Sequence, residues 1–183
     1  MSSLSDATNP ATEIIGGGRF LRLVRRGKWE YVERTGASGA AAIVAVTEEG
    51  RLVLIEQPRP ALGGVAIELP AGLVGDTPGD ESEEAATAAN RELTEETGYE
   101  AAHIELVAHG PSSPGLTSEC ISIFVATGLR KVGPGGGDGN EQITVFEVPL
   151  AEVEAWLAER IGRGAHVDLK VYAGLYFARR LGK

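Results

Sequence analysis

Apolar and polar residues alternate along much of the N-terminal third of the chain, which is the pattern of half-buried strands. The segments RFLRLVRR and KWEYVER predict one hairpin around Gly27. GAAAIVAVT and RLVLIEQ predict a second hairpin with a tight turn at Gly50. These four strands cover residues 19–26, 28–34, 39–47 and 51–57. Residues 1–18 are polar and end in three glycines, so a mobile tail is expected there.

A helical period replaces the alternation over residues 81–98. Asp80 and Glu83 have the spacing of a capping box, and Gly98 is placed to end the helix in the left-handed conformation. Later strands are predicted at 65–69, 101–110, 119–128 and 142–148. Two helices are predicted after them. The first is marked by Leu150, Val153, Trp156 and Leu157, and the second by Leu169, Tyr172, Leu175, Tyr176 and Arg179. Strands and helices do not alternate regularly, so an α+β fold with a mixed sheet is predicted.

Composition limits the classes of protein that fit. The 183 residues suit about one domain, at roughly 150 residues per domain. No apolar run reaches the roughly 18 residues of a membrane span, and the N-terminus lacks the pattern of a secretory signal. The net charge of -9 argues against a protein that coats nucleic acid. Cys120 is the only cysteine, so a reducing, cytoplasmic location is expected.

The helix predicted at 81–98 concentrates acidic residues. From its capping residue to Glu96 the segment carries seven acids and one base, Arg91. At about 100° per residue, Glu92, Glu95 and Glu96 fall on one stripe beside the core face. Two carboxylates about 5.5 Å apart repel by roughly 3 kcal/mol at an effective dielectric constant near 20. Mg²⁺ would relieve that repulsion; on spacing alone, a solvated helix face is an equal alternative.

The same residues resemble a known family. RELTEETGY, residues 91–99, matches the REUxEExGU core of the Nudix box at every position, and Glu83 stands where the box has its earlier Glu. IEQPRPALGG, IELPAGL, SPGLTSE and the NE before QITVFEV are similar to segments of the ADP-ribose (ADP-sugar) pyrophosphatase branch. The resemblance covers residues 19–180, nearly the whole chain.

The resemblance implies a Nudix fold, in which a mixed β-sheet lies between helices. It divides the chain into an N-terminal β subdomain at 19–38, which would form a homodimer, and a Nudix hydrolase domain at 39–183. The chain departs from the family in one spacing: ten residues separate Gly72 from Glu83, against five in the family. An inserted loop is therefore expected at 75–82.

The family's functional residues carry over onto matching positions. The implied metal ligands, for Mg²⁺ with Mn²⁺ as a substitute, are Glu92, Glu95, Glu96 and the carbonyl of Ala71. The implied catalytic residues are Glu141, Glu95 and Arg91, the last of which would orient a carboxylate. An exposed loop acid is the alternative interpretation of Glu141.

The resemblance also implies a substrate-binding set. Arg34 and Arg59 match positions that hold a diphosphate, and Trp29 and Glu30 match positions that recognise adenine. Glu68 and Gly115 are further candidates for the pocket. Core packing is the alternative for Trp29, and an arginine at a strand edge is the alternative for both arginines.

The implied activity is Mg²⁺-dependent hydrolysis of the diphosphate bond of ADP-ribose or a related nucleoside diphosphate sugar. The products from ADP-ribose would be AMP and ribose 5-phosphate, with no nucleic acid or membrane as partner. Other nucleoside diphosphate sugars or dinucleotides are alternative substrates. A Nudix-fold module that binds ADP-ribose without catalysis is an alternative of another class, although the intact acidic box disfavours it. An acidic protein-interaction domain would leave the PAGL and SPG segments unexplained.

Overall fold

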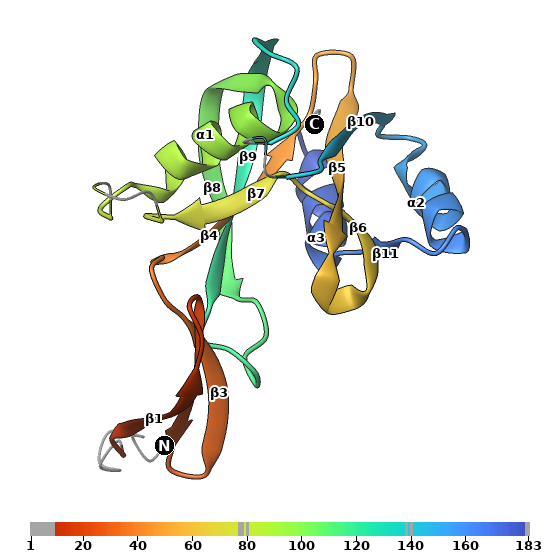
Figure 1. Ribbon diagram of the computed structural model, residues 1–183. Helices are drawn as coiled ribbons and strands as arrows, with labels where there is room; N and C mark the ends of the chain where they lie inside the picture. The colour runs from red at the N-terminus through yellow and green to blue at the C-terminus, as the bar shows by residue number, and fades with distance from the viewer. Residues whose placement is uncertain (1–9, 77–78, 80, 138, 140, 182–183) are drawn as a thin grey trace, which may run out of the picture.

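The computed structural model describes residues 10–76, 79, 81–137, 139 and 141–181. A small three-stranded sheet at the N-terminus projects from a larger body (Figure 1). The body contains two four-stranded sheets, with helices packed on them. None of the helices in the described part of the chain is long and apolar enough to cross a membrane.

The N-terminal sheet has the antiparallel order β1-β2-β3, with β1 at Thr12–Gly17, β2 at Leu21–Arg26 and β3 at Trp29–Arg34. The hairpin predicted around Gly27 is present, and this glycine has a φ of +60°. The sequence predicted a tail over residues 1–18, but residues 12–17 form β1. The predicted hairpin leaves one edge of β2 unpaired, and β1 satisfies the hydrogen-bonding groups of that edge. Residues 1–9 lie outside the described residues.

The strands of the body form two mixed sheets. They are β4 (Gly39–Ala45), β5 (Arg51–Arg59), β6 (Gly64–Glu68), β7 (Ala71–Val74), β8 (Tyr99–Pro111), β9 (Cys120–Lys131), β10 (Thr144–Pro149) and β11 (His166–Val167). One sheet has the order β7-β4-β9-β8 and the other has the order β10-β5-β6-β11. The β4–β9 and β6–β11 pairs are parallel, and the other pairs are antiparallel. The predicted α+β class with mixed sheet pairing is confirmed.

The second predicted hairpin is wrong beyond its turn, because β4 and β5 enter different sheets. Near Gly50, the two segments are joined by the Thr47 N–H bond to the Arg51 carbonyl (2.9 Å), the Arg51 N–H bond to the Thr47 hydroxyl (3.4 Å) and a bridge between Val46 and Leu52. Both strands carry runs of fully buried apolar residues rather than a strict alternation. Such strands need neighbours and cover on both faces, which two separate sheets provide.

Three helices complete the body: α1 at Ala85–Thr97, α2 at Val153–Gly162 and α3 at Leu169–Ala178. Helix α1 packs on β4, β7 and β8, whereas α3 packs on β4, β6 and β9 (Figure 1). Each of these two helices covers its own apolar cluster. The last predicted helix exists, but of its predicted markers only Leu175 is buried; Val171, Gly174 and Ala178 complete its buried face.

The start of α1 differs from the prediction, whereas its end agrees with it. The helix begins after Glu84, whose side chain makes no capping bond, so the predicted capping box is absent. Asp80 lies outside the described residues, and Glu83 instead accepts hydrogen bonds from Arg91. At the other end Gly98 has a φ of +71° and donates to the Thr94 carbonyl at 2.8 Å, as expected.

Candidate active site

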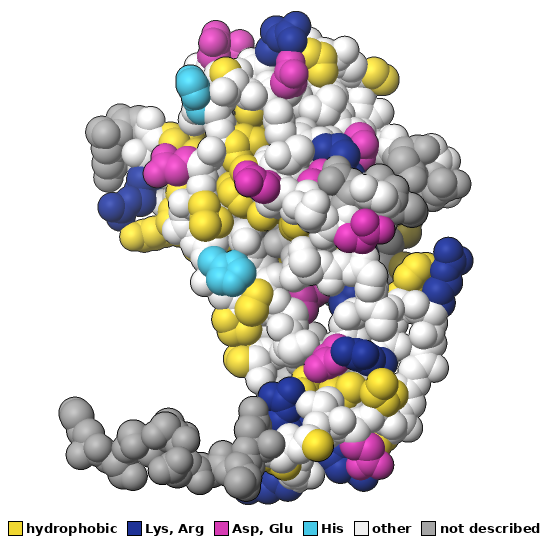
Figure 2. All heavy atoms as spheres, turned by 90° about the vertical axis from the view of Figure 1, so that its left-hand side faces the viewer, with side chains coloured by type: hydrophobic (Ala, Val, Ile, Leu, Met, Phe, Trp, Pro, Cys, Tyr) yellow, Lys and Arg dark blue, Asp and Glu magenta, His cyan; other side chains and the backbone are white. Residues whose placement is uncertain are grey.

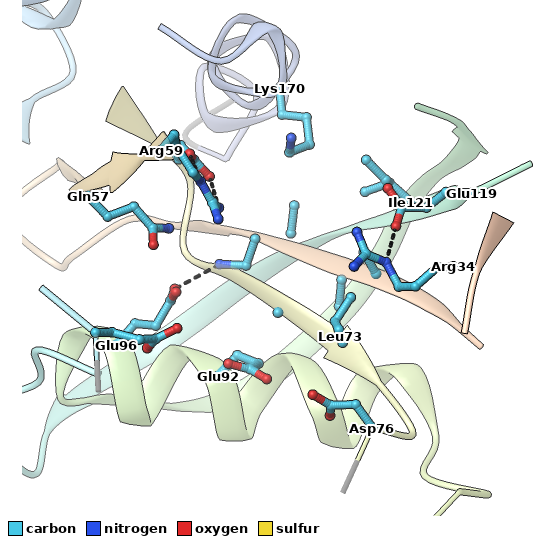
Figure 3. A pocket seen from close by; sticks show the side chains of 17 residues that line it. Arg34, Gln57, Arg59, Leu73, Asp76, Glu92, Glu96, Glu119, Ile121 and Lys170 are labelled. Carbon is cyan, nitrogen blue, oxygen red and sulfur yellow. Dashed lines mark hydrogen bonds and ion pairs between the residues drawn. The ribbon is translucent and has the colours of Figure 1, made fainter. Parts of the chain in front are cut away.

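A cleft of about 360 Å³ lies between α1 and the N-terminal end of α3 (Figure 3). It brings together seven residues of the predicted site: Arg34, Arg59, Glu68, Ala71, Glu92, Glu96 and Glu141. The α1 carboxylates lie on one side, and Arg59 and Lys170 lie on the other. Segments distant in the sequence therefore place acidic and basic groups on facing walls.

Glu96 is the most buried acid of the cleft, at 2% exposure. One carboxylate oxygen accepts a hydrogen bond from the backbone N–H of Ala71 at 2.8 Å. The pKa of Glu96 is raised to about 9, mainly by burial and to a smaller extent by the carboxylates of Glu92, Glu141 and Glu68, while the Ala71 bond opposes the shift. A negative charge at this position is therefore unfavourable until a cation joins the cleft.

Glu92 lies one helical turn before Glu96 and faces the same cleft. Burial raises the pKa of Glu92 to about 7, although Arg91 opposes that shift. Its carboxyl lies against Gly72 on β7: a Cβ added to Gly72 would lie 1.9 Å from the Glu92 carboxyl carbon. The glycine of the PAGL segment therefore makes room for the Glu92 carboxylate.

Arg91 organises the acids beside the cleft but does not line it. Its guanidinium donates to Glu83 at 3.1 and 3.2 Å, to Glu92 at 2.8 Å and to Glu95 at 3.2 Å. It also donates to the Leu73 carbonyl at 3.3 Å, which ties α1 to β7. Hydrogen bonding to Arg91 lowers the pKa of Glu83, whose side chain is only 3% exposed. This network orients the carboxylates, which is the role predicted for Arg91.

The predicted acidic stripe is divided in the structure. Glu95 has a side chain that is 44% exposed, and it lines a neighbouring groove together with Arg91 rather than the cleft. Glu92 and Glu96 face the cleft from the helix side, and Glu141 reaches it from the segment before β10. The cleft therefore unites two of the three predicted helix ligands with the predicted catalytic acid.

Both predicted diphosphate-binding arginines lie in the cleft, and each is paired with an acid. Arg59 makes two hydrogen bonds to Glu68, at 2.6 and 2.7 Å, and Arg34 makes one to Glu119 at 2.6 Å (Figure 3). Glu68 is 4% exposed, so its bond fixes the Arg59 fork firmly. The arginines are therefore held at the cleft wall by carboxylates before any substrate binds.

Several cleft residues escaped the sequence prediction. They are Gln57, Asp76, Glu119 and Lys170 among the polar side chains. Gln57 and Glu119 belong to the IEQPRP and SPGLTSE segments, so those segments carried a signal. Lys170 follows Asp168, which caps α3 and forms an ion pair with the lysine. No motif marked Lys170, because only the packing of α3 brings it to the cleft.

The donor groups fit a hard divalent cation. Within the described residues, no three His, Cys, Asp or Glu side chains stand close enough together to form a metal site. Arg91 holds Glu92 and Glu95, while the Ala71 N–H holds Glu96. The chemistry nonetheless suits such an ion, since Glu92 and Glu96 are buried carboxylates with raised pKa values, and carboxylate oxygens are the donors that a hard cation prefers.

The remaining predicted residues lie in a second groove, of about 390 Å³, on the N-terminal sheet. Trp29, Glu30 and Gly115 line it, and none of them lines the cleft. Trp29 is 63% exposed, so the alternative of core packing is wrong. Exposed apolar side chains also occur on this sheet, which forms the lower part of the molecule in Figure 2. The predicted adenine-binding residues are thus separate from the catalytic cleft of the same chain.

Comparison with known proteins agrees with this geometry. The chain is 32% identical over 167 residues to the methanol dehydrogenase activator of Bacillus methanolicus, covering 87% of this chain and 88% of that protein. It is 33% identical over 159 residues to the ADP-ribose pyrophosphatase of Bacillus subtilis, covering 83% of each. A solved structure of an ADP compounds hydrolase has the same fold, with a TM-score of 0.67 at 24% identity over 86% of both chains.

The family model of the NUDIX domain matches residues 37–167, which include α1 and most of the cleft. The match leaves out the N-terminal sheet, which supplies one wall of the second groove; the other wall, at residues 114–118, lies within the match. The intact box on α1, the cleft that it lines and the matching family model together show that this chain belongs to the Nudix family and is a Nudix hydrolase.

Proposed function

We propose that the chain hydrolyses the diphosphate bond of ADP-ribose or a related nucleoside diphosphate sugar, with Mg²⁺ as its cation. ADP-ribose would give AMP and ribose 5-phosphate. The observation that carries the proposal is the cleft itself, where buried α1 carboxylates face two carboxylate-held arginines. The likeness to a pyrophosphatase of ADP-ribose supports the choice of substrate.

Each wall of the cleft has a distinct task in this proposal. Arg34 and Arg59 bind the diphosphate oxygens, since their forks already point along the cleft wall and need little reorganisation. Glu92 and Glu96 would hold the divalent ion, together with the carbonyl of Ala71, and Glu95 would join through a rotation of its exposed side chain. Mg²⁺, when bound, neutralises the charge that develops on the phosphate oxygens.

Glu141 is the proposed base. It lines the cleft close enough to Glu96 for the two carboxylates to repel. It would position a water and accept its proton as the water oxygen attacks one phosphorus and the bridging oxygen leaves with the other phosphoryl group. Arg91 contributes indirectly, because its bonds to Glu92 and Glu95 orient both carboxylates.

We also propose that two copies of the chain form the working enzyme. The groove with Trp29 and Glu30 shares no lining residue with the cleft of its own chain, and it lies between β3 and residues 114–118. A second copy would bring this groove to the cleft, where Trp29 would stack on the adenine and Glu30 would accept a hydrogen bond from it. Light scattering should then give about 38 kDa, twice the chain mass of 19.2 kDa.

A panel assay tests the activity. Purified protein with Mg²⁺ is incubated with ADP-ribose, other nucleoside diphosphate sugars and dinucleotides, and the products are separated by chromatography. Release of AMP and ribose 5-phosphate at the highest kcat/KM from ADP-ribose supports the proposal. Binding of ADP-ribose without any product would instead identify a non-catalytic Nudix module.

A further inference from the structure

The glycine-rich segment before β10 begins with residues 132–137, which are docked on the last turn of α1 and on Gly98. The backbone N–H of Gly136 donates to the Glu96 carbonyl at 2.8 Å, and that of Gly137 donates to the Glu95 carbonyl at 3.0 Å. The last carbonyls of a helix have no partner within the helix. The segment therefore supplies donors to the two residues whose side chains are proposed metal ligands.

The docking requires glycine at position 135. Gly135 has a φ of +70°, in the left-handed region. A Cβ there would lie 2.4 Å from the carbonyl carbon of Thr97 and 2.7 Å from the carbonyl oxygen of Glu96. Both obstacles are backbone atoms of the helix and cannot rotate away. Any side chain at 135 must therefore lift the segment from α1.

The contact continues from Gly137 to Glu141. A Cβ on Gly137 would lie 2.5 Å from a carboxylate oxygen of Glu141 and 2.8 Å from its Cβ. The Glu141 side chain thus rests directly on the Cα of Gly137, whose N–H is bonded to α1. A continuous series of contacts links the last turn of α1 to Glu141, which lines the same cleft as Glu96.

We propose that Gly135 and Gly137 are positioning residues, which fix the carboxylate of Glu141 relative to Glu96 by docking the segment on α1. The role of Glu141 rests on the proposed function, whereas the docking stands on backbone geometry. A displacement of about 1 Å at a reacting group can cost on the order of a hundredfold in rate. The glycines therefore act on the chemical step rather than on the binding of substrate.

The experiment compares Gly135→Ala with Gly133→Ala. Gly133 lies in the same segment, but its φ is outside the left-handed region, and a Cβ there would meet nothing within 4 Å. We expect Gly135→Ala to lower kcat by about tenfold or more, while KM changes by less than about threefold. Gly133→Ala should leave kcat and KM within about twofold of the parent values. Equal effects of the two substitutions would overturn the proposal.

A second readout separates positioning from a general loss of structure. In the Glu141→Gln background, Gly135→Ala should lower kcat by less than about threefold, because the group that it displaces is already inactive. Full additivity of the two effects would overturn the coupling between Gly135 and Glu141. A circular dichroism melt of Gly135→Ala should remain cooperative, since the core does not contain this segment.

Amide hydrogen exchange tests the docking without any activity. The N–H groups of Gly136 and Gly137 should be protected in the parent protein and in Gly133→Ala, and should exchange faster in Gly135→Ala. Rapid exchange in the parent protein would overturn the docking itself. Protected amides combined with an unaffected kcat in Glu141→Gln would instead reject the proposed role of Glu141, so the two failures are distinguishable.

Discussion

The cleft of the body and the groove of the N-terminal sheet differ in how complete they are within one chain. In the cleft, Arg59 is bonded to an almost fully buried Glu68, and Glu96 is bonded to the backbone of β7. In the groove, Trp29 is 63% exposed and Glu30 is bonded to Arg25 at the surface. One region is held by buried polar contacts, and the other presents aromatic and charged groups to solvent.

This difference indicates a division of labour. A reaction at a diphosphate needs charged groups fixed before the substrate arrives, and the cleft supplies them from α1, β3, β5 and the segment before β10. The proposed recognition of adenine needs an exposed aromatic surface, and in the groove Trp29 would supply it. Substitutions in the cleft should therefore act on kcat, and substitutions in the groove should act on KM.

The largest expected effect is that of metal removal, which acts on the cleft alone. EDTA treatment followed by dialysis should abolish hydrolysis, because the cleft then lacks the cation that would neutralise the charge developing on the phosphate oxygens. Added Mg²⁺ should restore the rate, and Mn²⁺ should substitute for it. Undiminished hydrolysis of ADP-ribose after this treatment would refute the metal-dependent mechanism.

Glu96→Gln should lower kcat by roughly two orders of magnitude or more at saturating Mg²⁺, since the substitution keeps the size of the side chain and removes its charge. Glu84→Gln is a suitable control, because Glu84 lies at the exposed start of the same helix. Steady-state kinetics with a saturating metal concentration provides the measurement. Near-normal turnover of Glu96→Gln would remove this residue from the ligand set.

Glu141→Gln should lower kcat by about 10²–10⁴-fold, the usual contribution of a general base, with little change in KM. Steady-state kinetics with ADP-ribose at saturating Mg²⁺ separates the fall in kcat from any change in KM. If kcat falls less than tenfold, Glu141 is only a loop acid near the cleft.

Trp29→Ala tests whether the groove contributes to the binding of substrate. Stacking of a base on an aromatic ring contributes about 1–3 kcal/mol, so KM should rise roughly tenfold while kcat is retained. Phe20→Ala is the matched control, because Phe20 is 60% exposed near the same sheet but does not line the groove. A matching rise of KM in both variants would show a general effect of the sheet.

The smallest effect concerns stability without metal. The pKa of Glu96 is raised from 4.5 to about 9 in the folded protein, so the unfolded chain ionises this group more readily. Folding stability of the metal-free protein should therefore fall as pH rises from about 4.5 towards 9. Glu96→Gln should have a higher Tm than the parent protein at pH 7, and the difference should shrink at pH 5. A lower Tm at pH 7 would contradict the raised pKa.

The sequence predicted much of the site because its chemistry is local. The Nudix box lies within one helix, so helical geometry alone placed Glu92 and Glu96 one turn apart on the same side. The Glu95 carboxylate instead lies beside the neighbouring groove, where it accepts a hydrogen bond from Arg91, four residues before it. The sequence shows which acids lie on one face of a helix. It does not show which of the two hollows beside that helix each acid lines, because that depends on the elements packed against the helix.

The missed features are non-local. Lys170 reaches the cleft only through the packing of α3, and the separation of β4 from β5 depends on their pairing with distant strands. Strand β1 was missed because its glycines are typical of loops. It forms because its backbone pairs with the edge of β2 that the predicted hairpin leaves open. The docking of the glycine-rich segment on α1 was also missed, because it uses backbone atoms and leaves no trace in the pattern of side chains.

The most direct test of the division of labour is a hybrid dimer of one Glu96→Gln chain and one Trp29→Ala chain, purified through two different tags. If the groove of one chain serves the cleft of its partner, this dimer contains one fully intact site. It should then show the wild-type KM for ADP-ribose and about half of the wild-type kcat per dimer. Activity with only the raised KM of the Trp29→Ala homodimer would contradict the account, because it would show that each groove serves its own chain.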